Sequence, residues 1–299
     1  MSSGKVFKIG GSCLQSQDSY DGLWRIREKF GNGIFVFSAF DGVTDKLIKN
    51  FENGNKLAFA KYLLEKHRNI VSSKLNKDIQ ESQEMLLKMN GFNSVDLFYQ
   101  AIRNYNLEDY LSLGEKLSAS TGYLFLNHRF PSLYIPSDLL GVSVIDYNGI
   151  PSIEINESRT KFLEWKLDLQ NVNIITTGFF GKDKQGKIKT LGRNSSDYSA
   201  ASLSAITGSK KLFLFKDVNG IYEGDPKTGL YKSPLKRISY EFTINLIKNG
   251  SPIVHQRAVE LCRDYEIDIF VQNYNANKDG TIVSKFEDDL ELITKQGNK

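Results

Sequence analysis

The chain has 299 residues, of which 40% are hydrophobic and 25% are charged, and its net charge is +4. The length allows one large α/β domain or two lobes that share a cleft, and the composition is ordinary for a globular protein with a sizeable core. The mild charge, without a dense basic stripe, argues against a nucleic-acid partner, and the lack of a leader segment or a long apolar run argues against a membrane partner. We therefore expect a cytoplasmic protein.

The first half of the chain alternates short apolar runs with amphipathic stretches. Residues 6–9 and 34–37 are apolar runs typical of buried parallel strands, and each ends in small or turn-forming residues. Helical spacing of apolar residues predicts one or two helices over residues 56–90, and another helix is expected over residues 110–127. Two short strands, residues 133–135 and 142–145, and a helix at residues 157–168 complete this half.

The second half continues the alternation. Residues 172–180 give the strongest strand signal, and a glycine-bounded excursion with an expected hairpin turn follows at residues 181–186. The remaining expected elements, in chain order, are a small-residue helix to residue 205, a strand at 212–215, a helix capped by Ser239 that runs to 248, a helix at 255–266, and strands at 267–271 and 281–283.

This order of strands and helices predicts an α/β fold: three layers with a doubly wound, mostly parallel sheet. In such folds, ligands bind at the carboxyl ends of the strands. Nearly every polar motif in the sequence falls at an expected strand end, which favours functional interpretations of these motifs.

Cysteines and histidines give no sign of a metal centre. The two cysteines, Cys13 and Cys262, are far apart, and Cys262 is expected on the core face of a helix. The three histidines, His67, His128 and His255, stand alone, and each is expected at the surface or satisfied in the core. No metal ligand is assigned from the sequence.

The first candidate motif is the end of the opening strand. Lys8 is followed by Gly10, Gly11 and Ser12, which places a cation beside open backbone amides. Glycines allow close approach of the backbone to an oligophosphate, and successive amides form an anion-binding nest. An ordinary tight turn explains the same residues.

The second candidate motif precedes the small-residue helix. A guanidinium can hold a carboxylate with two hydrogen bonds, and Arg193 comes just before Ser196 and Asp197 at an expected helix N-terminus. Helix N-termini bind phosphate and carboxylate groups. Alternatively, Ser196 is only an N-cap and Arg193 only a surface residue.

Two further segments are uninformative alone. The loop at residues 216–227 is rich in turn formers and is long enough to hold an adenine and a ribose. Glu115 lies on an expected helix, where a lone glutamate usually faces solvent.

Together, these segments resemble the motifs of the aspartokinase branch of the amino acid kinase family. That family shows K-F-G-G-T-S, S-A-x-x-G-V/I-T-D, G-E-x-x-S, T-G-F-I-G, T-L-G-R-G-G-S-D and T-D-V-x-G-I/V-Y-x-x-D-P-R/K in this order. Similar segments occur here at residues 8–13, 38–45, 114–118, 177–181, 190–197 and 216–227. The resemblance runs from about residue 5 to residue 284, and several short motifs in fixed order are far more specific than any one of them.

The resemblance implies an amino-acid kinase domain over residues 1–287. An amino-acid-binding lobe, about residues 1–170, and a nucleotide-binding lobe, about residues 171–287, would lie around a cleft. Residues 288–299 would be a tail, and no ACT domain, the regulatory domain of aspartokinases, would follow.

The resemblance also implies a role for each motif residue. Lys8 and Asp197 would be catalytic, with Lys8 at the transferring phosphoryl group and Asp197 organising Lys8 and the phosphates. Arg193 would hold the α-carboxylate of the amino acid, and Glu115 its α-ammonium. The other implied amino-acid contacts are Ser38, Thr44, Asn194, Ser195 and Ser196. The implied nucleotide contacts are Lys8, Gly10, Gly11, Ser12, Lys216, Asp217, Tyr222 and Lys227.

The implied activity is transfer of the γ-phosphoryl group of ATP, with Mg²⁺, to the side-chain carboxylate of L-aspartate, giving 4-phospho-L-aspartate and ADP. A free aspartate side chain has a pKa of about 3.9, so it is already an anionic nucleophile at neutral pH and needs no general base. The partners would be a small amino acid and ATP, and a homodimer is possible.

The chain departs from the family at four positions of interest. Asn194 and Ser195 replace two glycines, and because asparagine tolerates positive φ we expect the turn to survive. Lys216 replaces a threonine, and Pro252 replaces a lysine that contacts phosphate in the family. We expect Lys216 to restore part of the lost charge. The alternatives are a family member that acts on a different small acid, and a catalytically impaired ligand-binding relative.

Overall fold

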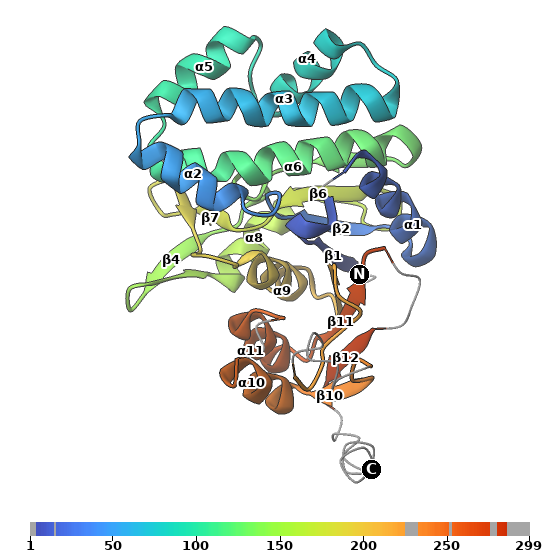
Figure 1. Cartoon of the computed structure of the whole chain (residues 1–299). Helices are drawn as coiled ribbons and strands as arrows, with labels where there is room; N and C mark the ends of the chain where they lie inside the picture. The colour runs from blue at the N-terminus through green and yellow to red at the C-terminus, as the bar shows by residue number, and fades with distance from the viewer. Residues whose placement is uncertain (1–3, 15, 225–232, 251–252, 276–279, 286–299) are drawn as a thin grey trace.

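The structure is a computed structural model, and it describes residues 4–14, 16–224, 233–250, 253–275 and 280–285. Its centre is an eight-stranded sheet (Figure 1). All neighbouring strands are parallel except β11 and β12, so the expected α/β fold with a mostly parallel sheet is confirmed. The strands, in their order across the sheet, are β10 (Arg237–Ser239), β12 (Thr281–Ser284), β11 (Asp268–Asn273), β9 (Lys211–Lys216), β1 (Lys5–Ile9), β2 (Gly33–Phe37), β6 (Asn173–Thr177) and β3 (Ser132–Tyr134).

Helices cover both faces of this sheet, and each face has its own hydrophobic core. One face packs against α1 (Asp21–Phe30), α2 (Val43–Glu52) and α6 (Leu107–Arg129), with α3 (Lys56–Leu75), α4 (Ile79–Met89) and α5 (Val95–Asn104) forming a further layer outside α6 (Figure 1). The other face packs against α8 (Ile155–Glu164), α9 (Ser196–Thr207), α10 (Tyr240–Lys248) and α11 (Gln256–Asp264). The short helices are η1 (Gly11–Leu14), η2 (Gln17–Tyr20) and α7 (Ser137–Leu140).

The alternation of side chains along two neighbouring strands positions the cations of the cleft. Along β1, Val6 faces the α9 side of the sheet and Phe7 the α6 side, so Lys8 returns to the α9 side at the end of the strand. Along β9, Leu214 faces the α9 side, so Lys216 does too. Because β1 and β9 are parallel neighbours, both lysines emerge at the same edge of the sheet.

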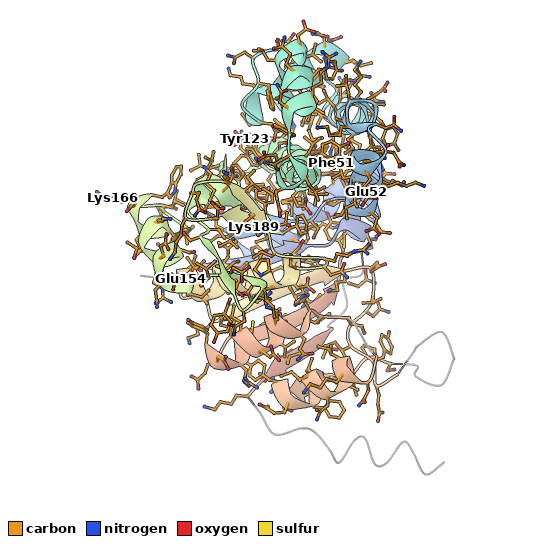
Figure 2. The ribbon with its side chains drawn as sticks, turned by 90° about the vertical axis from the view of Figure 1, so that its left-hand side faces the viewer. Phe51, Glu52, Tyr123, Glu154, Lys166 and Lys189 are labelled. Atoms are coloured by element: carbon orange, nitrogen blue, oxygen red, sulfur yellow. The ribbon has the colours of Figure 1, made fainter. Side chains whose placement is uncertain are left out.

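Two small hairpins lie outside the main sheet. In one, β4 (Val144–Tyr147) pairs with β5 (Ile150–Ile153); in the other, β7 (Phe180–Lys182) pairs with β8 (Ile188–Thr190). The strand expected at residues 142–145 therefore belongs to a hairpin and not to the sheet, while the hairpin expected after residue 181 is confirmed. Figure 2 shows Glu154 where the first hairpin leads into α8, and Lys189 on the second hairpin, where its ammonium lies 3.5 Å from Glu108 of α6.

Several element boundaries differ from the sequence-based expectations. The long strand expected at residues 172–180 divides into β6 and β7, because Phe179 has a φ of 74° and breaks the extended backbone. The helix expected to reach residue 168 ends at Glu164, and Lys166 has a φ of 49°. Helices α1, α2 and α5 and strand β10 were not expected, and the predicted tail lies outside the described residues.

The isolated cysteines and histidines mostly lie where they were expected. Cys262 is buried in the core, and His128 is exposed. His67 is buried and hydrogen-bonded to the Thr121 hydroxyl at 2.9 Å, so it is a satisfied core histidine. His255 is the exception, since it lines the cleft described below. Among the described helices, none has both the length and the apolar character that a bilayer crossing requires.

Candidate active site

A cleft of about 770 Å³ opens at the carboxyl ends of β1, β2, β6 and β9. This is the edge at which parallel α/β sheets place their ligands. Thirteen of the residues singled out in the sequence line it: Lys8, Gly10, Gly11, Ser12, Ser38, Thr44, Glu115, Arg193, Asn194, Ser196, Asp197, Lys216 and Asp217.

Asp197 is the centre of the charged part of this cleft. It lies in the first turn of α9 and is 4% exposed. Its Oδ1 is 3.0 Å from the ammonium of Lys8, and its Oδ2 is 2.8 Å from the ammonium of Lys216. The backbone N–H of His255 donates a weaker third bond to Oδ2 at 3.3 Å. The carboxylate is thus held from β1, from β9 and from the residue that precedes α11.

This arrangement sets the charge of the site. Burial alone would raise the pKa of Asp197, but the ammonium groups of Lys216 and Lys8 outweigh it and hold the pKa well below its ordinary value. Burial lowers the pKa of Lys216, and the carboxylate of Asp197 opposes that shift. The cluster of two ammonium groups and one carboxylate carries a net positive charge, which suits an anionic ligand.

Glu115 is a buried carboxyl group of the same cleft. It projects from the middle of α6 and is 2% exposed. The backbone N–H of Ala39 donates to its Oε1 at 3.3 Å, whereas its Oε2 is buried without a hydrogen-bond partner among the described residues. Burial raises the pKa of Glu115 to about 8. An unpartnered buried oxygen that faces a cleft is well placed to accept a bond from a cationic ligand.

Arg193 is the exposed cation of the cleft. Its guanidinium pairs with Asp45, in the first turn of α2, and both side chains are largely exposed. Thr44, the neighbour of Asp45, also lines the cleft. Asn194 has a φ of 61°, so the expectation that asparagine preserves the left-handed turn is confirmed. Ser195 is fully buried and does not line the cleft, so this predicted amino-acid contact is not brought into the site.

The two glycines after β1 have a structural role that the sequence did not reveal. A Cβ on Gly11 would lie 2.1 Å from the carbonyl oxygen of Ala39, so close packing against the loop after β2 already requires glycine there. Gly10 donates its N–H to the carbonyl of Phe215 at 3.1 Å, and a Cβ would approach that same oxygen. These contacts hold the end of β1 against its neighbours, whatever ligand the loop binds.

One predicted nucleotide contact does not reach the cleft, and another is outside the described residues. Tyr222 is buried and does not line it, because the chain turns inward after Gly220 and Ile221 hydrogen-bonds to Thr281 at 2.8 Å. Lys227 lies outside the described residues, and so does Pro252.

The structure also adds residues that sequence reasoning did not single out. Asp45 and His255 line the cleft; Asp45 ends the segment 38–45 that resembles a family motif, and His255 follows Pro252, the position of the family lysine, by three residues, so the comparison itself was the available signal. Burial lowers the pKa of His255, whose Nδ1 is buried without a partner among the described residues. Val218, Ile247 and Ile253 form an apolar part of the lining, and Ile247 belongs to no motif.

The fold and the cleft define an α/β protein with a small-molecule site at the strand ends, cationic around Asp197 and with the buried carboxyl group of Glu115 in the same cleft. The sequence model of the amino acid kinase family matches residues 4–273, and the chain belongs to that family.

Curated relatives of the chain carry aspartokinase names. Aspartokinase of Geobacillus stearothermophilus is 24% identical over 262 residues, covering 87% of this chain and 59% of the relative. The bifunctional aspartokinase/homoserine dehydrogenase of Buchnera aphidicola is 27% identical over 297 residues, covering 93% of this chain and 36% of the relative. Aspartokinase of Rickettsia felis is 35% identical over 133 residues, covering 44% of this chain and 33% of the relative. The chain thus spans from a third to three fifths of the length of these relatives.

Solved structures share the fold. Aspartokinase III of E. coli, in complex with aspartate and ADP, superposes with a TM-score of 0.79 at 23% identity, covering 95% of this chain and 65% of that chain. Aspartate kinase of Clostridium acetobutylicum gives a TM-score of 0.75 at 22% identity, covering 94% of this chain and 63% of that chain.

Proposed function

We propose that this chain is an aspartate kinase, which transfers the γ-phosphoryl group of ATP to the side-chain carboxylate of L-aspartate. The observation that carries the proposal is the buried cluster of Lys8, Asp197 and Lys216 in the same cleft as Glu115 and Arg193. Relatives named aspartokinase, and a solved relative in complex with aspartate and ADP, support the choice of substrate.

The amino acid would bind between Glu115 and Arg193, and its positive charge would favour the ionised form of the Glu115 carboxyl. Its α-ammonium would meet the free Oε2 of Glu115, and its α-carboxylate would meet the guanidinium of Arg193. Ser38 and Thr44 offer hydroxyls nearby, and the Ser38 Oγ is buried without a partner among the described residues. The side-chain carboxylate would then point toward Lys8.

The chemical step is a displacement at phosphorus. The acceptor carboxylate forms a new bond to the γ-phosphorus while the bond from that phosphorus to the β–γ bridging oxygen breaks, and ADP leaves with the electron pair. Both partners are anions, so the step depends on positive charge and on positioning. Lys8 and Lys216 supply the charge, and Asp197 fixes the two ammonium groups relative to each other.

The residues present fit a magnesium nucleotide. The apolar side chains of Val218, Ile247 and Ile253 would pack against the base, and the amide-rich segment after β1 would face the phosphates. Mg²⁺ is usually held by substrate phosphates, waters and one or two carboxylates, and Asp217 is the carboxylate at this end of the cleft. When bound, Mg²⁺ would offset phosphate charge. No group of three potential metal-ligating side chains occurs in the part of the chain that the structure describes.

The proposal also includes a division into two lobes and an oligomeric state. The amino-acid-binding part would comprise about residues 1–170 and the nucleotide-binding part about residues 171–287, with the cleft between them. A homodimer in solution remains a prediction, which sedimentation equilibrium tests.

The test is a coupled assay of ADP release with aspartate, glutamate, other small dicarboxylic acids and small phosphonates as acceptors. Hydroxylamine traps an acyl phosphate as a hydroxamate, so aspartate-dependent hydroxamate is the expected result. ADP release with a different acid would reassign the acceptor. Nucleotide binding without turnover on any acceptor would indicate a catalytically impaired relative.

A second candidate, a kinase for a different small acid, is favoured by one observation. Asn194 is exposed in the cleft beside Arg193, at a position where the family carries glycine. Its side chain takes up space where the amino acid would bind, which favours an acceptor of altered shape. The same panel of acceptors separates the two candidates.

A further inference from the structure

Arg257 joins α11 to α9 and to the β4–β5 hairpin. It lies in the first turn of α11, and its Nη1 donates to the carbonyl oxygen of Pro151 at 3.0 Å. Its Nη2 donates to the Ser152 hydroxyl at 2.8 Å. Both acceptors belong to β5, in the β4–β5 hairpin. The guanidinium also lies over the ring of Tyr198, 4.0 Å from its centroid.

Tyr198 makes this contact relevant to the cleft, because it follows Asp197 directly in α9. The tyrosine is 6% exposed, and its hydroxyl accepts the backbone N–H of Ile153 at 3.2 Å. Tyr198 is thus held by the hairpin through its hydroxyl and by Arg257 through its ring. A bidentate, stacked arginine of this kind cannot be replaced by lysine without losing contacts.

The residue two positions before Arg257 contacts Asp197 itself. The backbone N–H of His255 donates to Asp197 Oδ2, the oxygen that Lys216 also contacts. The start of α11 therefore contacts two consecutive residues of α9. His255 contacts Asp197, and Arg257 contacts Tyr198. Because the hairpin anchors Arg257, it also fixes where the His255 N–H points.

We propose that Arg257 is a positioning residue that keeps the Asp197 carboxylate aligned between Lys8 and Lys216 by tying the start of α11 to the β4–β5 hairpin across Tyr198. The inference rests on the proposed phosphoryl transfer, because it assigns Arg257 an effect on the transfer step. Arg257 touches neither reactant in this arrangement; it acts through Asp197.

A specific kinetic signature follows. Loss of alignment at Asp197 weakens the hold of Lys8 and Lys216 on the phosphates, so kcat and nucleotide affinity should fall. Glu115 and Arg193 are held by other elements, so the KM for the acceptor should change little. Charge-assisted hydrogen bonds of this kind correspond to about a tenfold to hundredfold effect when they are lost, and we expect kcat to fall within that range.

The experiment compares three arginine variants of the full chain. Arg257→Met removes the charge and both hydrogen bonds but keeps apolar bulk over Tyr198, and Arg257→Lys restores the charge alone. Arg263→Met is the matched control, because Arg263 lies at the other end of α11 and pairs with its neighbour Asp264 at the surface. For each variant we would measure kcat, both KM values, Mg·ADP affinity by calorimetry and the thermal midpoint.

The expected result is a kcat reduced by about tenfold to a hundredfold in Arg257→Met, an intermediate value in Arg257→Lys, and an unchanged value in Arg263→Met. Normalisation to the folded fraction removes any contribution from lost stability. Unchanged kcat and nucleotide affinity per folded molecule in Arg257→Met would overturn the proposal, as would an equal rise in the acceptor KM.

The binding measurement separates this proposal from the proposed function. If the wild-type chain phosphorylates no acid, the proposed function fails, but Mg·ADP affinity still reports on the alignment of Lys8 and Lys216. Weaker Mg·ADP binding by Arg257→Met than by Arg263→Met would then support the positioning role, and equal binding would reject it.

Tyr198→Phe provides a second variant that removes the bond from Ile153 while keeping the ring. We expect its Mg·ADP affinity and kcat to fall between those of the wild type and those of Arg257→Met.

Discussion

The ammonium of Lys216 lies 2.8 Å from Asp197 Oδ2, on the carboxylate oxygen that Lys8 does not contact. The aspartokinase motif carries threonine at this position, so the second cation of the cluster is a feature of this chain. Lys216 is largely buried, and its orientation toward Asp197 excludes the alternative that it points to solvent. The lysine therefore contributes to the cleft and not to the surface.

Lys8→Met is expected to abolish phosphoryl transfer while leaving the fold nearly intact. Removing one partner of a buried ion pair usually costs about 3–5 kcal/mol, because a charge is left unpaired. Here Asp197 keeps Lys216 and the N–H of His255, so the loss in the free energy of unfolding should be well below that range. Chemical denaturation and the coupled kinase assay measure the two effects. Near-normal turnover in the variant would show that the end of β1 is only structural.

Glu115→Gln should change how stability depends on pH. Burial raises the pKa of Glu115 in the folded chain from 4.5 to about 8, so between these values the folded state holds a proton that the unfolded state has released. Stability contributed by this group therefore falls as pH rises through that window, with a slope of at most about 1.4 kcal/mol per pH unit.

Urea unfolding of both proteins between pH 5 and pH 9 tests this sign. The difference should be small at pH 5, and the glutamine variant should gain stability relative to the wild type as pH approaches 8. Parallel curves for the two proteins would mean that Glu115 titrates normally. The variant should also raise the KM for the acceptor, since glutamine carries no charge for the α-ammonium.

Asp45→Asn is expected to improve acceptor binding slightly. In the absence of acceptor, Asp45 holds the guanidinium that the proposed function assigns to the substrate carboxylate. Exposed ion pairs contribute only about 0.2–1 kcal/mol, so freeing Arg193 should lower the acceptor KM by no more than about fivefold. Arg193→Met should raise that KM instead. An increase in KM for Asp45→Asn would show that Asp45 assists binding and does not compete with it.

Most of the sheet could be predicted, because its central strands are continuous apolar runs bounded by glycine or polar residues. The strand break at Phe179 could not, since an aromatic residue with φ of 74° is uncommon. Helix α1 has charged residues on much of its surface and buries mainly Leu23, Trp24 and Ile26, so its short apolar stripe was not recognised.

The candidate site likewise has features that could be predicted from the sequence and features that could not. The alternation along β1 and β9 is visible in the sequence and is enough to bring Lys8 and Lys216 to one face of the sheet. The burial of Tyr222 could not be predicted, because the preceding residue, Ile221, is held by a hydrogen bond to Thr281, 60 residues later in the chain. The pairing of Arg193 with Asp45 joins residues 148 positions apart and likewise needs the folded chain.

The last prediction concerns compensation between Lys216 and Pro252. The family places a phosphate-contacting lysine where this chain has proline, and proline provides neither a charge nor a backbone donor. A charge-assisted hydrogen bond is worth about 1.5–3 kcal/mol, so an uncompensated loss would cost roughly tenfold to a hundredfold in rate or affinity. Because Lys216 reaches Asp197 from β9, it can supply the second ammonium beside Lys8.

A double-mutant cycle of Pro252→Lys and Lys216→Thr, with ATP affinity and turnover as readouts, tests the idea. Lys216→Thr should be severe alone and mild when Pro252→Lys is present. If both backgrounds respond equally, the two positions act independently, and Lys216 has a role of its own in the cleft that no lysine at position 252 can replace.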